Sequence, residues 1–397
     1  MKIEQTDYLN SLGSYAFAKV DRSRRKLLKE KGADYLIDFG VGDPTDPTPP
    51  VAREATAVSA LSEPQLGYPS YNGEPFFREA VAGWFERRFQ VKLDPKTEIT
   101  ATPGSKQAVF CLPMAFVNPG DRVLIPDPGY PPYTTGTLQR GGKPIFLPLK
   151  PENNFLPDLE AISETTAKAA KVLWLNSPNN PTGRVIPADF LEKAISFCRE
   201  YNILLCSDEA YSEMYYDPDS PPVSLFSIPG GKAVGLVFHS LSKRSNMTNY
   251  RIGFVAGSPR LLDSYRQVQT NLHSGQAQLL QAGAAAALGD EEHVEKMREI
   301  YAARRNLLLP YLEQAGFKQL YSEGGFYIWA QTPEALDGSR TCQLLLEKAG
   351  INTTPGPALA QQPENASDFI RFALVPNLKK TEEAGRRITG LKLGEIV

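Results

Sequence analysis

The sequence predicts an α/β protein in which a mainly parallel sheet is covered by helices on both faces. Apolar runs rich in β-branched residues alternate with segments of helical periodicity, an order typical of β-α-β units. The runs are almost continuously apolar, as expected of parallel strands buried on both faces. Polar and glycine-rich motifs follow directly after several runs, at the edge where open α/β sheets bind ligands.

The expected elements of the main sheet occupy the first two thirds of the chain. A short strand at 35–39 comes first, and the buried strands are expected at 123–125, 144–148, 172–175, 203–206 and 234–238. Helices are expected at 51–61, 74–89, 105–116, 157–166 and 187–200.

The alternation weakens beyond Arg251, which indicates a second, smaller α+β domain. Two long helices at 259–289 and 290–316 are expected to lead into it. We expect residues 1–50 to form an N-terminal arm and part of the small domain, 51–290 the large domain, and 291–397 the C-terminal small domain. Within the small domain, strands are expected at 325–329 and 369–373, and helices at 341–348 and 379–389.

Composition excludes several classes of function. A net charge of -2 over 397 residues gives no basic field for nucleic acid. The cysteines have no C-x-x-C spacing and the three histidines are scattered, so no metal site is expected. No apolar segment approaches the length of a membrane span, and the N-terminus lacks a signal-peptide core. We therefore expect a soluble cytoplasmic protein with reduced thiols.

Lys243 is the first candidate for chemistry. It follows the strand at 234–238 in the stretch HSLSKR, with Arg251 a few residues on. A lysine held at a buried strand end can lose its proton near neutral pH and act as a Schiff-base amine. Taken alone, the stretch is more typical of a solvated surface loop; the polar residues that follow the other strands favour chemistry.

Those other residues also stand where strands end or helices begin. Asp208 and Tyr211 follow the strand at 203–206, Asn180 follows 172–175, and Tyr130 follows 123–125. Further candidates are Gly104, Ser105 and Lys106 at a helix start suited to an anion, Tyr68 in a turn, Gly42 after the first strand, and Arg371 between apolar neighbours in a strand.

Together these residues resemble the class I/II, fold-type I aminotransferases that depend on pyridoxal 5′-phosphate. The match covers nearly the whole chain, and the motifs fall in the family's order. The resemblance implies a seven-stranded sheet in the large domain. It also implies ping-pong transfer of an amino group between an amino acid and a 2-oxo acid.

The resemblance also implies a role for each candidate. Lys243 would carry the cofactor as a Schiff base and then move protons, while Asp208 would pair with the pyridine nitrogen. For the rest of the cofactor, Tyr211 and Asn180 would bond its phenolic oxygen, Tyr130 would stack on its ring, and Ser240, Arg251, Gly104, Ser105 and Lys106 would hold its phosphate. For the substrate, Arg371 would clamp the α-carboxylate, and Gly42, Asn180 and Tyr130 would line the pocket. Tyr68 would reach the phosphate of a neighbouring subunit, which implies a homodimer with shared sites.

The substrate is indicated by shorter segments. Dicarboxylate-specific members bring an arginine from the partner in the segment at 269–274, which here contains none. The segments at 127–137, 154–159 and 212–217 look like those of diaminopimelate aminotransferases of lysine biosynthesis. This favours LL-diaminopimelate or N-succinyl-diaminopimelate, with glutamate and 2-oxoglutarate. The basic segment at 22–26 could meet a distal carboxylate, although a solvated helix face is more typical of such a charge run.

Other functions stay open from the sequence. An aminotransferase for aspartate, alanine or aromatic amino acids, or a carbon-sulfur β-lyase, would use the same cofactor residues. A ligand-binding regulator derived from an aminotransferase is less favoured, because no helix-turn-helix segment precedes the domain. A nucleotide-binding module is not favoured, because G-x-G-x-x-G does not follow the first strand.

Overall fold

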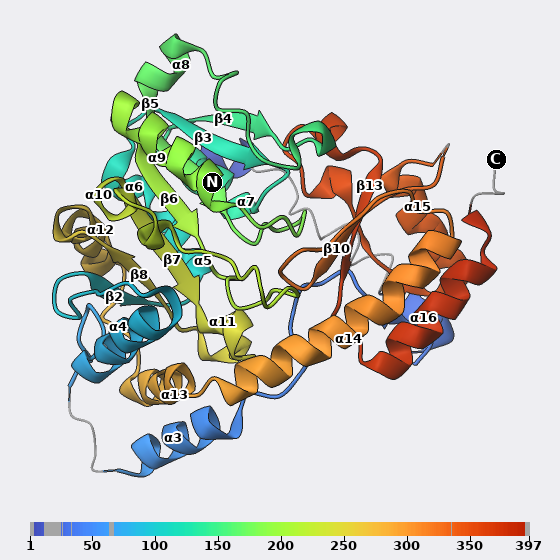
Figure 1. The fold of residues 1–397 in the computed structure, drawn as a ribbon, viewed down its shortest axis with the longest axis horizontal. Coiled ribbons are helices and arrows are strands. Elements are labelled where there is room, and N and C mark those ends of the chain that lie inside the picture. The colour runs from blue at the N-terminus through green and yellow to red at the C-terminus, as the bar shows by residue number, and fades with distance from the viewer. Residues whose placement is uncertain are drawn as a thin grey trace.

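The fold is taken from a computed structural model, which describes residues 4–11, 25, 27–32, 34–62, 67–334 and 336–393. A large layered α/β domain is joined to a smaller domain by the long helix α14 (Glu292–Gln314), which runs diagonally across Figure 1. Apart from Arg25, the basic segment at 22–26 lies outside the described residues.

The large domain is built on a seven-stranded sheet in the order β2-β8-β7-β6-β5-β3-β4. All neighbouring pairs are parallel except those of β8, which is antiparallel to both β2 and β7. The predicted fold class is therefore confirmed. The strands are β2 (Ile99–Thr102), β3 (Arg122–Asp127), β4 (Lys143–Pro148), β5 (Ala170–Asn176), β6 (Leu204–Asp208), β7 (Gly235–Ser240) and β8 (Gly253–Gly257).

Helices cover both faces of this sheet because its strands are apolar on both sides. On β5, Leu173 and Leu175 belong to one core cluster, whereas Val172 and Trp174 belong to the other, which is the alternation of a strand. On the first face lie α3 (Pro50–Leu61), α4 (Pro75–Phe89), α9 (Ala188–Tyr201) and α13 (Gln278–Gly289). On the second lie α5 (Ser105–Cys111), α7 (Pro131–Gln139) and α12 (Pro259–Leu272).

Several predicted boundaries were wrong. The helix expected at 105–116 breaks at Pro113, which begins the short α6 (Pro113–Phe116). The helix expected at 157–166 is the later α8 (Glu164–Ala169), whose first turn is capped by the Ser163 hydroxyl. The helix expected at 259–289 is interrupted after Leu272 and forms α12 and α13. Strand β8 was not predicted, because glycines flank its short apolar run and resemble loop signals.

The small domain has a four-stranded antiparallel sheet in the order β12-β13-β10-β9. A separate pair joins β1 (Ile37–Asp38) in parallel to β11 (Ile351–Asn352). This part of the N-terminal region therefore packs with the small domain. The sheet strands are β9 (Leu320–Tyr321), β10 (Tyr327–Gln331), β12 (Thr354–Pro355) and β13 (Phe369–Ala373), and α15 (Gly338–Leu344) and α16 (Leu378–Gly390) complete the domain.

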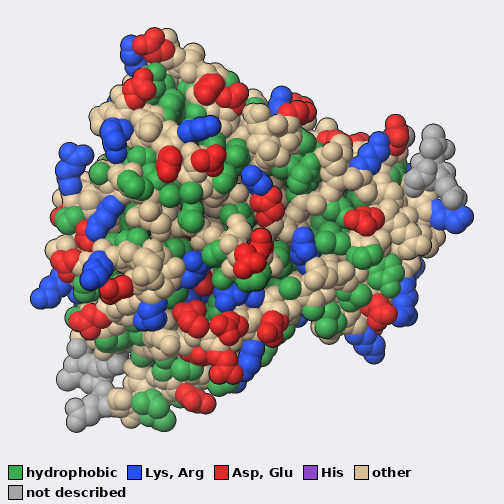
Figure 2. Space-filling view, viewed as in Figure 1, with side chains coloured by type: hydrophobic (Ala, Val, Ile, Leu, Met, Phe, Trp, Pro, Cys, Tyr) green, Lys and Arg blue, Asp and Glu red, His purple; other side chains and the backbone are tan. Residues whose placement is uncertain are grey.

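The surface fits the nearly neutral composition. Figure 2 shows acidic and basic side chains interspersed over the visible face. Among the described residues, no helix is both long and apolar enough to cross a membrane. Within the same residues, histidine, cysteine and carboxylate side chains form no group of three or more that could hold a metal ion.

Candidate active site

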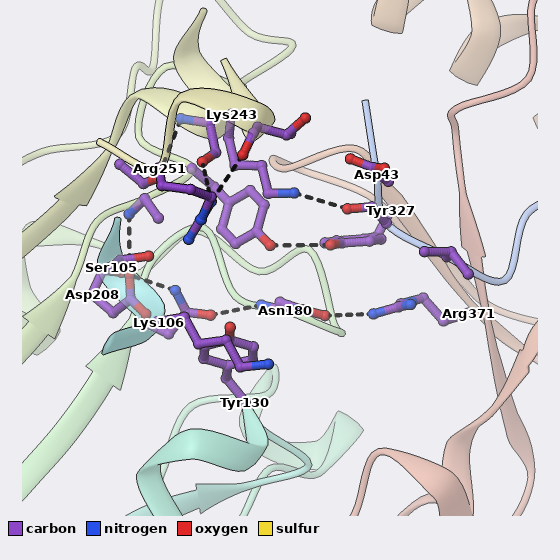
Figure 3. Close-up of a pocket in the computed structure, with 18 of the residues that line it drawn as sticks. Asp43, Ser105, Lys106, Tyr130, Asn180, Asp208, Lys243, Arg251, Tyr327 and Arg371 are labelled. Carbon is purple, nitrogen blue, oxygen red and sulfur yellow. Dashed lines mark hydrogen bonds between the residues drawn. The ribbon is translucent and has the colours of Figure 1, made fainter. Parts of the chain in front are cut away.

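A cavity of about 760 Å³ opens at the carboxyl edge of the large sheet, where the small domain meets it (Figure 3). The predicted site residues that line it are Gly42, Ser105, Lys106, Tyr130, Asn180, Asp208, Tyr211, Ser240, Lys243, Arg251 and Arg371. The structure thus brings together side chains from strand ends, helix starts and the small domain.

Gly104 and Tyr68 do not line this cavity. Gly104 lies directly behind it, with φ of +76°, and a Cβ there would stand 2.5 Å from Nη2 of Arg251. The positive φ favours glycine here, and the missing Cβ leaves room for the Arg251 guanidinium. Tyr68 is 86% exposed, so it lies open at the surface of its own chain.

Lys243 enters the cavity from α11 (Leu241–Arg244), a single turn capped by the Ser240 hydroxyl, which accepts from Ser242 N at 3.2 Å. Its Nζ donates to the carbonyl oxygen of Gly42 at 2.8 Å. Burial lowers the pKa of Lys243 to about 8; the nearby Asp43 carboxylate opposes the shift, and Arg371 adds to it. A substantial fraction of the amine is therefore neutral, and hence nucleophilic, at mildly alkaline pH.

Asp208 ends β6 and is only 3% exposed. The Tyr133 hydroxyl donates to its Oδ2 at 2.6 Å, and Ala210 N donates to Oδ1 at 3.2 Å. Burial raises the pKa of Asp208 to about 6, whereas these two hydrogen bonds act to lower it. The carboxylate is therefore mainly ionised at neutral pH, ready for a cationic partner.

Arg371 lies in β13 and points from the small domain across the cavity (Figure 3). Its Nη1 donates to Oδ1 of Asn180 at 2.9 Å, and its Nη2 donates to the carbonyl oxygen of Gly40 at 2.9 Å. Its guanidinium carbon lies 4.5 Å from the ring centroid of Tyr327. A planar fork of donors is thus held at the wall of the cavity, suited to a carboxylate.

The opposite end of the cavity is rich in cations and hydroxyl groups. Arg251 Nη1 donates to the Thr248 carbonyl oxygen at 3.0 Å and approaches Ser242 Oγ at 3.4 Å. Ser105 and Lys106 begin α5 and line the same cavity. Such a set of donors suits a phosphate dianion.

Comparison with known proteins identifies the family. The sequence model described as "Aminotransferase class I and II" matches residues 34–388. The chain belongs to this family. The aminotransferase activity predicted from the sequence is therefore confirmed, as is its dependence on pyridoxal phosphate.

Individual relatives agree with the family. The chain is 44% identical to an LL-diaminopimelate aminotransferase of Aquifex aeolicus, over 98% of this chain and all of that one. It is 43% identical to a protein of the same name from Gloeobacter violaceus, over 95% of this chain and 96% of the relative. Among solved structures, BacF from Bacillus subtilis superposes with a TM-score of 0.92 at 33% identity, covering 99% of each chain. A probable N-succinyldiaminopimelate aminotransferase from Thermus thermophilus gives 0.87 at 31% identity, covering 94% of this chain and 99% of that one.

The donor set of this aminotransferase fits its cofactor. The cavity presents an amine of lowered pKa at Lys243, a buried carboxylate at Asp208, and a cationic end around Arg251. Pyridoxal phosphate carries an aldehyde, a pyridine nitrogen and a phosphate, whose chemistry matches an amine, a carboxylate and a cationic group, respectively.

Sequence reasoning missed several residues of this site. Tyr133 bonds Asp208, and Tyr327 shares a hydrogen bond of 3.0 Å with Tyr211. In the sequence, Tyr133 belongs only to the segment at 127–137, and Tyr327 only to the strand expected at 325–329. The aromatic-rich surroundings of both gave no signal that a hydroxyl would meet a functional partner.

Proposed function

We propose that this aminotransferase transfers an amino group between LL-diaminopimelate and 2-oxoglutarate, which becomes glutamate, in lysine biosynthesis. The observation that carries the proposal is the 44% identity to the Aquifex aeolicus protein of that name over nearly the full chain. N-succinyl-diaminopimelate is the second candidate, because the Thermus thermophilus structure is of a probable aminotransferase for that compound. The two substrates differ at the distal end, where one has an ammonium group and the other an amide.

In the proposed site, Lys243 would hold the cofactor at its reactive end through a covalent bond. Asp208 would keep the pyridine nitrogen protonated, and Tyr211 and Asn180 would donate to the phenolic oxygen. When bound, the cofactor supplies an electron sink for negative charge that develops at the substrate's α-carbon. The remaining contacts are a stack on Tyr130 and a phosphate cradle of Ser105, Lys106, Ser240 and Arg251, while Gly104 lies behind Arg251 and leaves room for its guanidinium.

Arg371 is proposed to bind the α-carboxylate of the substrate. Both of its terminal nitrogens now donate to neutral oxygens, on Asn180 and Gly40. A carboxylate is a stronger acceptor for a guanidinium than an amide oxygen, because both partners are charged. The substrate therefore takes over donors that are already aligned, beside a pocket wall formed by Gly42, where a Cβ would meet the Tyr327 hydroxyl at 2.5 Å.

Lys243 is proposed to have a second role as a general acid and base. Once the amine of the substrate has replaced Lys243 in the covalent bond to the cofactor, the freed Lys243 amine would take the proton from the α-carbon of the substrate and return it on the cofactor side. In the structure, Nζ donates to the Gly42 carbonyl oxygen 2.8 Å away, and both residues line the cavity. Donor and acceptor react in turn, so the kinetics are of the ping-pong type.

The active form is proposed to be a homodimer in which Tyr68 reaches the phosphate in the partner's cavity. The exposed Tyr71, Phe76 and Leu272 provide apolar surface near Tyr68. Gln269 Nε2 donates to the Tyr71 carbonyl oxygen at 2.8 Å, which joins this turn to α12.

Mixed dimers test the sharing of sites. Co-expressed Tyr68→Phe and Lys243→Ala chains form hybrids in which one of the two sites has both native residues. We expect activity well above that of either variant alone. Activity no higher than that of the variants would show that Tyr68 serves its own chain or no site.

Two further assignments are proposed. The domain division at 1–50, 51–290 and 291–397 is supported by separate core clusters, one around Phe254 in the large domain and one around Phe372 in the small domain. A cytoplasmic location is supported by the four cysteines, all of which are free thiols.

The substrate proposal is tested with the purified enzyme and its bound cofactor. LL-diaminopimelate is expected to bleach the visible absorbance of the cofactor and, with 2-oxoglutarate, to yield glutamate. N-succinyl-LL-diaminopimelate, aspartate and alanine serve as comparison donors. If a comparison donor bleaches the cofactor and has a kcat/KM far above that of LL-diaminopimelate, the protein is still an aminotransferase, but the proposed substrate is wrong.

A further inference from the structure

Tyr327 begins β10, at the point where the small domain reaches the large one. It follows Gly324 and Gly325, which allow a close approach of the two domains. A Cβ on Gly324 would stand 2.5 Å from the ring of Pro178, and Gly325 N donates to the Met214 carbonyl oxygen at 2.7 Å. Tyr327 itself is 2% exposed and lines the cavity.

Tyr327 contacts both halves of the site. Its hydroxyl lies 3.0 Å from that of Tyr211, which belongs to the proposed cofactor side. A dashed line at Tyr327 in Figure 3 marks this hydrogen bond. Its ring lies under the guanidinium of Arg371, on the substrate side, at 4.5 Å. Asn180 also contacts Arg371, through its amide oxygen. Tyr327 contacts a proposed ligand of each side with two separate parts of its side chain, the hydroxyl and the ring.

We propose that Tyr327 is a positioning residue for both ligands: its hydroxyl orients the hydroxyl of Tyr211, and its ring holds the guanidinium of Arg371. The inference rests on the roles proposed above for Tyr211 and Arg371.

The direction of the hydroxyl bond follows from the number of donors. A tyrosine hydroxyl has one hydrogen to donate. If Tyr211 donates that hydrogen to the phenolic oxygen of the cofactor, its own oxygen can only accept from Tyr327. The two hydroxyls then form a chain in one direction, and a donor that also accepts is polarised and donates more strongly. Tyr327 thereby strengthens the hydrogen bond that Tyr211 makes to the cofactor.

The ring of Tyr327 acts separately from its hydroxyl. A guanidinium over an aromatic face is attracted by the ring quadrupole, and more so when both groups are buried. Arg371 is 2% exposed, so the ring replaces water on one face of the guanidinium and leaves its edge directed at Asn180 and Gly40. This contact fixes the plane of the Arg371 guanidinium, and therefore the plane in which it can bind a carboxylate.

Two substitutions separate the two effects. In cofactor-loaded Tyr327→Phe, the pH at which the visible absorbance changes is expected to rise by about half a unit, because a weaker bond from Tyr211 stabilises the ionised phenolic oxygen less. The KM for the amino donor is expected to stay within about twofold, since the ring remains. In Tyr327→Leu, the same spectral shift is expected, together with a rise in KM of about tenfold.

Tyr211→Phe and Tyr301→Phe are the controls. Tyr301 is also buried and packs against Phe326, but its hydroxyl has no hydrogen-bond partner among the described residues, so its variant should titrate like the native enzyme. Tyr211→Phe should give the largest rise in the pH at which the visible absorbance changes. If Tyr211→Phe titrates normally, the proposed cofactor contact of Tyr211 is wrong. If it shifts while Tyr327→Phe does not, or if Tyr327→Phe raises KM as much as Tyr327→Leu, the role of Tyr327 is overturned.

Discussion

The two sides of the cavity are assembled in different ways. On the large-domain side, Asp208, Lys243 and Asn180 lie at or shortly after the ends of neighbouring strands in one parallel sheet. On the small-domain side, Gly42 and Arg371 come from opposite ends of the chain. A repeating topology thus positions the first set, whereas the second set depends on the packing of distant segments.

Hydrogen bonds connect the two sides across the cavity. Lys243 donates to Gly42, and Arg371 donates to Asn180. We infer a division of roles between the two sides: large-domain residues determine the rate of the chemical step, and small-domain residues determine substrate binding. The following predictions test that division.

The largest effect is expected at Lys243. Without its amine, Lys243→Ala has no covalent anchor and no base for the α-proton, so the rate of amino transfer should fall by about 10⁴-fold. Single-turnover absorbance with the amino donor measures this rate. The exposed Lys171→Ala variant is the control and should react at the native rate. A Lys243→Ala rate within tenfold of native would assign the chemistry to another base.

A smaller loss is expected at Asp208. Asp208→Asn removes the charge that stabilises a protonated pyridine nitrogen, and kcat should fall by about 10²- to 10³-fold with little change in KM. Glu209→Gln is a matched control, because this neighbouring buried carboxylate bonds Ser207 and Leu225 instead of facing the cavity. Steady-state kinetics of both variants measure this difference. An equal fall in kcat in the two variants would mean that any buried carboxylate in this region affects catalysis, and not only one that faces the cavity.

On the small-domain side, Arg371→Lys should affect mainly KM. Lysine keeps the charge but loses the planar fork, so KM for the amino donor should rise by about 10²-fold, while kcat falls less than tenfold. Arg387→Lys, in α16 and outside the cavity, is the control. A kcat loss larger than the KM effect would break the proposed division between the two sides.

The same contrast explains what the sequence could predict. Asp208, Asn180 and Lys243 were found because each follows an apolar run, and the carboxyl ends of parallel strands meet at one edge. Arg371 was found because a charge in an apolar strand is costly without a partner. Tyr327 was missed because a tyrosine in a strand is ordinary core, and only the tertiary contact with Tyr211 distinguishes it. Strand β8 was missed because the glycines that flank its short apolar run resemble loop signals.

The smallest effect expected is on the pH dependence of the free energy of unfolding of the cofactor-free protein. The pKa of Lys243 is lowered by burial to about 8, whereas in the unfolded chain it stays near its ordinary value of about 10.5. Between these values the unfolded state binds the extra proton, so the free energy of unfolding should rise with pH, by at most about 1.4 kcal/mol per pH unit. Below about pH 8 both states are protonated, and the contribution of this group is constant.

Denaturant unfolding of native and Lys243→Met protein from pH 7 to 10.5 isolates this contribution as a difference between the two curves. Arg371→Gln makes the test specific to the contact between domains. The positive charge of Arg371 helps to lower the pKa of Lys243, so its removal should shift the start of the rise to higher pH. An unchanged start would mean that Arg371 does not act on the pKa of Lys243, which burial, Asp43 and Arg251 would then determine.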